Sequence, residues 1–233
     1  MSIKIFYDGA NSKDISELSD DAGIDGFTTN PTLMRKDEVR NYSDFIKWAT
    51  IQAPNKPFSF EVFADDLDDI YFQAKRISHL GGNIYVKIPI TNTKRESTKP
   101  VIKALLEDGI KVNITAVMLY CQVAELKDIL REYDTPSIVS VFAGRISDTG
   151  VCPMHTMYKI GELLKYTNSE LLWASTRSVY NITEAGAIGA DIITCNKSII
   201  DKYWNLKNKN LRDHSLDTVK MFYNDAKKAG YTL

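Results

Sequence analysis

The feature that most restricts the fold of this chain is a repeated exchange between strand-like and helix-like segments. Short runs rich in isoleucine, valine and phenylalanine are each followed by a segment whose apolar residues recur at helical spacing. Such alternation favours a parallel sheet covered by helices, and eight repeats favour closure of the sheet into a barrel. The sequence therefore predicts an α/β fold, a single (β/α)8 TIM barrel. The expected strands are residues 3–7, 26–29, 58–63, 84–88, 110–117, 137–142, 171–175 and 191–194.

The chain shows no internal boundary between domains. No linker rich in proline, glycine or serine interrupts it and its composition does not shift, so residues 1–233 are expected to form one domain. An extra amphipathic segment, about residues 216–229, follows the eighth unit and carries Val219, Phe222 and Tyr223 on one face. A barrel does not need this C-terminal helix. We therefore expect the helix to cap the domain or to pack on a second copy in a homo-oligomer.

Charge and composition exclude several classes of partner. The 29 basic and 30 acidic residues give a net charge of -1, and 44% of the residues are hydrophobic. This balance favours neither a nucleic acid nor a membrane surface as a partner. No apolar run approaches the ~20 residues of a membrane span, and the chain starts without a signal-peptide core, so the expected location is cytoplasmic. Cys121, Cys152 and Cys195 are widely spaced and odd in number, which indicates reduced thiols.

The strand-like run Ile84–Ile90 contains a lysine, Lys87, among apolar residues. Lysine is rarely buried unless it is paired or used in chemistry. One interpretation is structural: the long apolar stem lets the amine lean past the strand end into solvent. The other is functional: an amine in a dry pocket attacks a carbonyl and forms a Schiff base. The run alone does not separate these two interpretations.

Polar residues follow most of the predicted strands. Each one alone is more often a turn or cap residue than a catalyst. Because a TIM barrel carries its active site at the carboxyl ends of its strands, seven such clusters favour one shared pocket. Together they suit a polyhydroxylated carbonyl compound with an anionic group. The residues are Asp8, Thr29, Asn30, Glu61, Lys87, Asn113, Thr115, Ser140, Arg145, Ser175 and Arg177.

Other chemistries find less support in the sequence. The histidines, His79, His155 and His214, lie away from the predicted strand ends, so no metal site is expected. Dinucleotide binding requires Gly-x-Gly-x-x-Gly after the first strand, where this chain has Asp8-Gly9-Ala10-Asn11. Neither a P-loop nor a nucleophile elbow is present.

Seven segments, in order over nearly the whole chain, resemble the small transaldolase group. This group includes the fructose-6-phosphate aldolases and consists of class I Schiff-base enzymes on a (β/α)8 barrel. The combination of Thr-Thr-Asn-Pro with a later Val-Lys-Ile-Pro is specific to this resemblance. The segments are Tyr7-Asp8-Gly9-Ala10-Asn11, Gly26-Phe27-Thr28-Thr29-Asn30-Pro31, Phe60-Glu61-Val62, Val86-Lys87-Ile88-Pro89, Val112-Asn113-Ile114-Thr115, Ser140-Val141-Phe142-Ala143-Gly144-Arg145 and Ala174-Ser175-Thr176-Arg177.

The resemblance implies a catalytic set. Lys87 forms an imine with a ketose carbonyl, and Asp8 accepts the proton of the C4 hydroxyl as the C3–C4 bond breaks. Glu61 and Thr115 hold the water that relays protons during imine formation and release. The imine itself is the electron sink, so the resemblance implies no cofactor.

The resemblance also implies a substrate-binding set for sugar phosphates. Asn30, Asn113 and Ser140 bind the hydroxyls of the dihydroxyacetone unit. Arg145, Ser175 and Arg177 hold the terminal phosphate, for which charged donors are suited. The pattern has one departure at Gly9, where the family usually has threonine.

Two positions divide the subgroups. Aldolases that release free dihydroxyacetone tend to have glutamine and tyrosine where this chain has Glu61 and Phe142. The expected function is therefore that of a transaldolase, which moves a dihydroxyacetone unit from a ketose phosphate, such as fructose 6-phosphate or sedoheptulose 7-phosphate, to an aldose phosphate. The polar loop Thr91–Thr98 keeps open an aldolase or a transaldolase of a variant acidic sugar. A non-catalytic sugar-phosphate-binding barrel is the third alternative.

Overall fold

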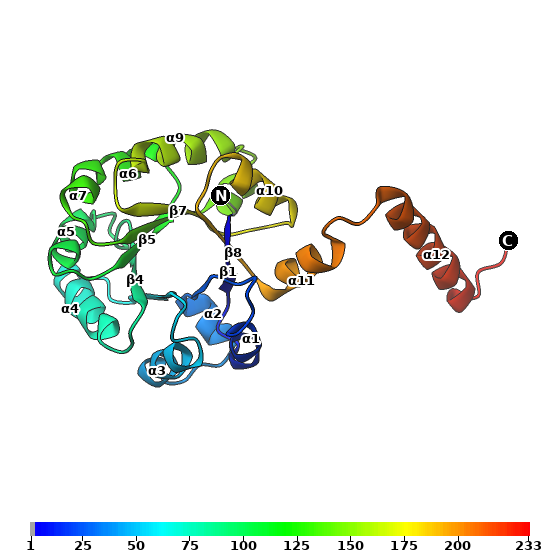
Figure 1. Cartoon of the computed structure of the whole chain (residues 1–233), viewed down its shortest axis with the longest axis horizontal. Helices are drawn as coiled ribbons and strands as arrows, with labels where there is room; N and C mark the ends of the chain where they lie inside the picture. The colour runs from blue at the N-terminus through cyan, green and yellow to red at the C-terminus, as the bar shows by residue number, and fades with distance from the viewer. Residues whose placement is uncertain (1–2) are drawn as a thin grey trace.

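The computed structural model describes residues 3–233, and its centre is a closed parallel barrel (Figure 1). Each strand pairs with the next along the chain, and β8 returns to pair with β1, which confirms the predicted fold class. The strands of these residues are β1 Lys4–Asp8, β2 Gly26–Thr28, β3 Phe58–Glu61, β4 Ile84–Pro89, β5 Val112–Val117, β6 Ser137–Val141, β7 Ser169–Trp173 and β8 Ile192–Cys195.

Helices follow every strand, and α1 to α10 surround the barrel in Figure 1. Sequence periodicity predicted the longer ones but not α2 and α8, which directly follow β2 and β6. The helices are α1 Ser12–Leu18, α2 Pro31–Lys36, α3 Tyr42–Gln52, α4 Leu67–Ser78, α5 Lys99–Glu107, α6 Tyr120–Ala124, α7 Lys127–Glu132, α8 Ala143–Asp148, α9 Met154–Leu164, α10 Tyr180–Ala187, α11 Lys197–Leu206 and α12 Leu211–Ala229.

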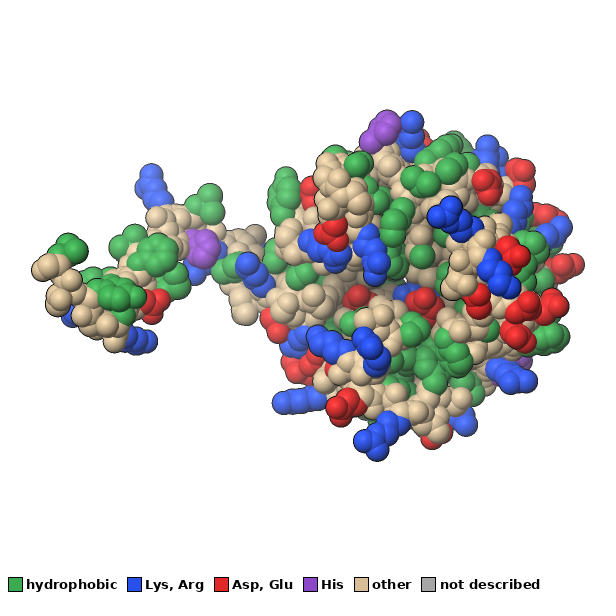
Figure 2. Space-filling model, turned by 180° about the vertical axis from the view of Figure 1, so that it is seen from behind, with side chains coloured by type: hydrophobic (Ala, Val, Ile, Leu, Met, Phe, Trp, Pro, Cys, Tyr) green, Lys and Arg blue, Asp and Glu red, His purple; other side chains and the backbone are tan. Residues whose placement is uncertain are grey.

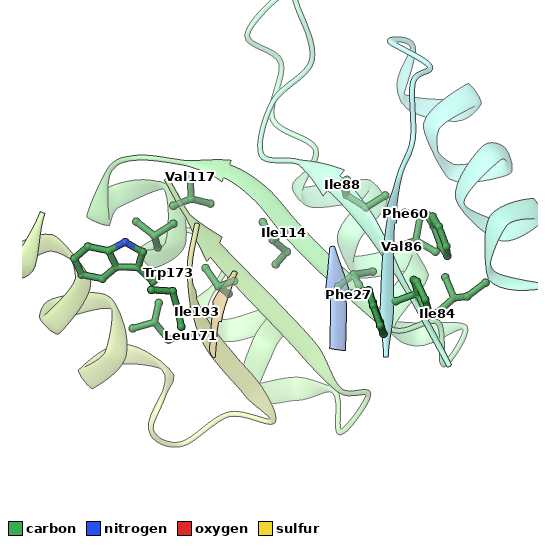
Figure 3. Close-up of a cluster of buried hydrophobic side chains, with 14 of the residues drawn as sticks. Phe27, Phe60, Ile84, Val86, Ile88, Ile114, Val117, Leu171, Trp173 and Ile193 are labelled. Carbon is green, nitrogen blue, oxygen red and sulfur yellow. The ribbon is translucent and has the colours of Figure 1, made fainter. Parts of the chain in front are cut away.

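Alternation along the strands divides the buried side chains into two layers. The larger layer lies between strands and helices, and Figure 3 shows Phe60 and Trp173 in it. The smaller layer fills the barrel interior with Phe6, Ile138, Leu172, Ala174 and Ile192, and Tyr85 packs against it. Since successive side chains of a strand point to opposite faces, Lys87 shares the inward direction of Tyr85.

The C-terminal helix α12 lies apart from the barrel in Figure 1, and none of its described residues is buried. The predicted start at 216 was five residues too late, because the first turn is polar and its periodicity is hidden. The helix begins instead at Leu211, where the Asn210 side chain accepts a hydrogen bond from the Arg212 amide. Among residues 3–233, no helix combines the length and apolar composition needed to cross a membrane.

Candidate active site

A cavity of about 560 Å3 opens at the carboxyl ends of the strands. Figure 2 shows the hollow at the centre of one barrel face, with acidic and basic side chains in its depth and basic ones around its rim. The cavity wall brings together most of the residues that sequence reasoning selected. These are Asp8, Asn30, Glu61, Lys87, Ser140, Phe142, Arg145, Ser175 and Arg177. Thr29, Asn113 and Thr115, which sequence reasoning also selected, are buried and do not line the cavity.

Lys87 is buried inside the barrel, with 5% of its surface exposed. Its Nζ atom donates a hydrogen bond to the Thr29 carbonyl at 3.0 Å and lies 3.4 Å from the Glu61 Oε2 atom. The ion pair follows from the sheet register, which places Lys87 beside Glu61 on the neighbouring strand. This arrangement rules out the structural interpretation, in which the Lys87 amine extends past the strand end into solvent. The amine instead faces the cavity beside a carboxylate that can exchange a proton with it.

Among residues 3–233, two buried threonine hydroxyls near the strand ends have no protein partner. Within the described part of the chain, the Thr29 and Thr115 hydroxyls are buried and make no hydrogen bond. Buried hydroxyls usually have partners, so the Thr115 hydroxyl, which shares the inward face of β5 with Asn113, is suited to a water. The Thr29 side chain points to the opposite face of its strand from Thr28. The Tyr42 hydroxyl fixes the strand end by donating to the Glu61 carbonyl, and burial raises the pKa of Tyr42.

Asp8 ends β1 and is oriented by a neighbouring strand. The Thr28 hydroxyl donates to Asp8 Oδ1 at 2.8 Å, as the register between β1 and β2 allows. Burial raises the pKa of Asp8, whereas the Lys87 charge and the Thr28 hydrogen bond act in the opposite direction. The net effect is a raised pKa, so Asp8 holds a proton more readily than an exposed aspartate, which suits a group that accepts and returns a proton.

The departure at Gly9 has a steric cause. A Cβ atom at this position would lie 2.1 Å from the Tyr7 hydroxyl oxygen, so threonine does not fit unless Tyr7 moves. Tyr7 is held in place because its hydroxyl donates to Asp14 Oδ2 at 2.8 Å. Glycine at position 9 thus leaves room for the Tyr7 hydroxyl. The hydrogen bond that orients Asp8 comes from Thr28.

A second hydrogen-bonded chain lies on the other side of the barrel interior. Ser140 on the cavity wall donates to Asn113 Oδ1 at 2.7 Å, and the Asn113 amide donates to the Ser59 hydroxyl at 3.0 Å. Asn113 is completely buried, so it orients Ser140 from behind. The single Ser140 proton is used in this contact, which leaves the oxygen of Ser140 as an acceptor toward the cavity.

The two arginines of the cavity come from adjoining segments. Arg177 forms a two-point ion pair with Asp148, with Nε–Oδ1 at 3.1 Å and Nη2–Oδ2 at 2.5 Å. The Arg145 guanidinium lies 5.5 Å from the centre of the Phe142 ring. The Arg177 hydrogen bond holds the pKa of Asp148 below its ordinary value. This end of the cavity is therefore rich in planar cationic donors, the groups that bind phosphate well.

The segments that carry these arginines touch through their backbones. A Cβ atom at Gly144 would lie 1.6 Å from the Ser175 carbonyl oxygen, so only glycine permits this approach. Ser175 itself adopts a φ of 66°, which a non-glycine residue rarely does. A fixed backbone contact thus sets the separation of Arg145 and Arg177.

Sequence reasoning missed several cavity residues, namely Thr28, Lys36, Thr176, Thr194 and Asn196. The inward alternation of β2 and β8 could have identified Thr28 and Thr194, whereas the sequence analysis selected Thr29. Thr29 instead offers its carbonyl to Lys87. Lys36 ends the unpredicted α2, so no periodicity indicated it.

The polar loop Thr91–Thr98 does not line this cavity. Thr93 binds it to the loop after β3, with the amide and the hydroxyl donating to Asp65 at 2.8 and 2.6 Å. In residues 3–233, no group of three or more histidine, cysteine, aspartate or glutamate side chains is arranged to hold a metal ion.

Comparison with known proteins identifies relatives over most of the chain. The chain is 34% identical over 233 residues to a "Probable transaldolase" of Hyphomonas neptunium, covering 98% of this chain and 99% of the relative. Similar proteins of Nitrosopumilus maritimus and Lactiplantibacillus plantarum are 33% and 32% identical, covering 86% and 92% of this chain and 86% and 96% of the relatives.

Solved structures at low identity share the barrel. "QR15, an Aldolase" has a TM-score of 0.58 at 14% identity and covers 88% of this chain and 95% of its own. A monomeric dihydrodipicolinate synthase variant has a TM-score of 0.61 at 9% identity and covers 83% of this chain and 69% of its own. These likenesses concern the fold alone.

The family model described as "Transaldolase/Fructose-6-phosphate aldolase" matches residues 5–233. It spans every strand except the first residue of β1, and with it all the strand-end residues of the cavity. The match confirms the resemblance that the sequence segments indicated. The chain belongs to the transaldolase/fructose-6-phosphate aldolase family.

Proposed function

We propose that this protein is a transaldolase that carries a dihydroxyacetone unit on Lys87 as a Schiff base. Donors are ketose phosphates such as fructose 6-phosphate or sedoheptulose 7-phosphate, and the acceptor is an aldose phosphate. The observation that carries the proposal is the burial of Lys87 Nζ in the strand-end cavity, 3.4 Å from Glu61. A buried amine beside a proton acceptor is the arrangement that carbonyl attack requires.

In the first step, Lys87 Nζ attacks the C2 carbonyl of the ketose, and the carbinolamine loses water to give an imine. Glu61 takes and returns the protons of this step, through a water that the Thr115 hydroxyl helps to hold. The unpartnered Thr115 hydroxyl supports this role, because it offers a buried donor and acceptor to such a water.

In the second step, the C3–C4 bond breaks and its electron pair moves to the iminium nitrogen, leaving an enamine on Lys87. Asp8 accepts the C4 hydroxyl proton while the aldose leaves. The enamine carbon then attacks the carbonyl of the incoming aldose, and Asp8 returns a proton to the new hydroxyl. The raised pKa of Asp8 supports this role, since a base that must also return its proton works best with a matched pKa.

The choice between transfer and simple cleavage depends on what can protonate the enamine. Phe142 is half-buried on the cavity wall and its ring lies under the Arg145 guanidinium. A phenyl ring supplies no proton, so the enamine persists until an aldehyde arrives. This supports a transaldolase over the alternative, a fructose-6-phosphate-type aldolase.

Trapping with borohydride tests the proposal. Reduction in the presence of fructose 6-phosphate should fix the sugar covalently on Lys87, and mass spectrometry of the digest locates the adduct. Lys87→Met keeps the length and apolar stem of the side chain, so the fold should remain while adduct and turnover are lost.

The control is Lys36→Met, which removes the second lysine on the cavity wall and should keep the adduct. An adduct on a lysine other than Lys87 would refute the assignment. Free dihydroxyacetone released as fast as it is transferred would favour the aldolase.

A further inference from the structure

Two buried threonines adjoin Asp8 on a side of the cavity that the mechanism above does not use. Thr28 on β2 and Thr194 on β8 are 3% and 4% exposed, and their hydroxyl oxygens are hydrogen-bonded to each other. Thr28 is also bonded to Asp8, which makes a chain of three polar groups from three adjacent strands. Both threonines lie on the inward face of their strands.

The directions of these hydrogen bonds follow from counting protons. An ionised carboxylate can only accept, and each hydroxyl has a single proton to donate. When Asp8 is ionised, Thr28 therefore gives its proton to Asp8 at 2.8 Å. The bond between the two hydroxyls must then use the proton of Thr194, so the chain runs from Thr194 through Thr28 to Asp8.

The chain reverses when Asp8 gains a proton. A protonated carboxyl can donate to the Thr28 oxygen, and Thr28 then turns its own proton toward Thr194. Two hydroxyl rotations accomplish this change without displacing a heavy atom, and the proton of Thr194 turns toward the cavity, whose wall includes Thr194. Both protonation states of Asp8 thus keep their hydrogen bonds at a site where unsatisfied polar atoms are costly.

We propose that Thr194 is a positioning residue that acts through Thr28 to support Asp8 in both protonation states. The proposal rests on the proposed function, in which Asp8 first accepts and later returns a proton. It assigns a role to the β8 hydroxyl, which contacts Asp8 only through Thr28.

The charged neighbours of Asp8 do not replace this support. Lys87 from β4 stabilises only the ionised form of Asp8, and its own ion-pair partner is Glu61 from β3. Tyr7 and Cys195 flank Asp8 on β1 and β8, and burial raises the pKa of both, that of Cys195 to about 12. Tyr7 and Cys195 are therefore both neutral near pH 7. The hydrogen-bond acceptors for protonated Asp8 come from the pair Thr28 and Thr194.

Thr194→Val keeps the shape of the side chain and removes the hydroxyl. In this variant the ionised Asp8 still receives the Thr28 proton. In the protonated form, an Asp8 proton that points at the Thr28 oxygen displaces the Thr28 proton, which then no longer has the Thr194 oxygen as its acceptor. Loss of the Thr194 proton weakens the hydrogen bond from Thr28 to ionised Asp8 by only about 10–30%. Loss of an acceptor for the buried Thr28 proton costs the protonated form more free energy. The pKa of Asp8 should therefore fall, by about one pH unit.

The experiment measures this pKa in two ways on the full-length protein. The acid limb of the kcat profile should move to lower pH in Thr194→Val, and kcat at neutral pH should fall ~10-fold with little change in KM. The 13C titration of the Asp8 carboxyl, assigned by its loss in Asp8→Asn, should move by the same amount. Thr194→Ser should restore both values, and Thr194→Ala should behave as valine does.

An unchanged Asp8 titration in both Thr194→Val and Thr194→Ala would overturn the proposal, as would a serine variant that behaves like valine. The carboxyl titration needs no substrate. If borohydride gives no Lys87 adduct, the proposed function fails, and the titration still decides the role of Thr194.

Discussion

Arg177 is already ion-paired, so only part of its guanidinium group is free for the proposed phosphate site. Asp148 occupies the Nε and Nη2 side of Arg177, which leaves Nη1 and one Nη2 proton for a ligand. The pair is about half exposed, so solvent screens it and its contribution to folding is small. Arg177→Ala should therefore alter binding more than stability.

We expect Arg177→Ala to raise KM for fructose 6-phosphate by roughly 10- to 100-fold, since a lost charged hydrogen bond costs about 1.5–3 kcal/mol. Steady-state kinetics with phosphorylated and non-phosphorylated substrates measures the difference. The non-phosphorylated substrate should be affected far less. Asp148→Asn is the matched control, because it keeps the arginine and removes only the charge that orients it. Equal losses on both substrates in Arg177→Ala would mean that the arginine is structural.

Phe142 is the residue expected to preserve the enamine. Phe142→Tyr, alone or with Glu61→Gln, should move the enzyme from transfer toward cleavage, because a nearby phenol can protonate the enamine. General acid catalysis is typically worth ~10² to 10⁴ in rate, which is enough to change this partition. The measurement is the release of dihydroxyacetone from fructose 6-phosphate without an acceptor. Phe142→Leu, which adds no proton donor, serves as control and should release no more than wild type.

Residue identity predicted all the charged residues of the cavity except Lys36, because they lie at or near strand ends that periodicity located. Alternation along β2 separates Thr28, which faces the barrel interior, from Thr29, but the sequence analysis did not apply it. Contacts between distant segments could not be predicted from the sequence. It did not indicate Asp148, whose contact with Arg177 spans 29 positions in the chain. Such pairings depend on how α8 meets the segment after β7, a tertiary contact without a local pattern.

At the scale of elements, the barrel was predictable because strand and helix periods are local properties. The short helices α2 and α8 were missed, since a single turn and a half shows no clear repeat. Asn30-Pro31 still contained the information for α2: the Asn30 side chain accepts from the Leu33 amide, and proline occupies the first helical position. Thr98 occupies the N-cap position of α5, but its hydroxyl donates to the Pro89 carbonyl and not to the helix.

The whole molecule exposes more surface than its size predicts. A folded monomer of 26.3 kDa should expose about 10,600 Å2, whereas this chain exposes 13088 Å2. The detached helix α12 contributes to the excess, because none of its described residues is buried and Leu216, Val219, Phe222 and Tyr223 are each more than half exposed. Figure 2 shows hydrophobic side chains on the surface of this helix. The helix does not cap the barrel, and its packing on a second copy of the chain, the other alternative of the sequence analysis, stays a prediction.

We expect the protein to be a homo-oligomer held in part by α12. Val219→Asp with Phe222→Asp should lower the oligomeric mass measured by light scattering, because a buried unpaired charge opposes association. Asn224→Asp adds a charge on the opposite side of the helix and should leave the mass unchanged. A wild-type protein that is monomeric at micromolar concentration would contradict this prediction.

The two buried layers of the barrel have separate tasks, and this separation bears on how such a protein can change over time. Helix packing depends on the outward side chains, Phe60 and Trp173 among them, whereas the proposed chemistry uses inward ones such as Lys87 and Thr194. A substitution at an inward strand end therefore leaves most of the packed core untouched. New substrates can be acquired on this scaffold one position at a time, without passing through poorly folded ancestors.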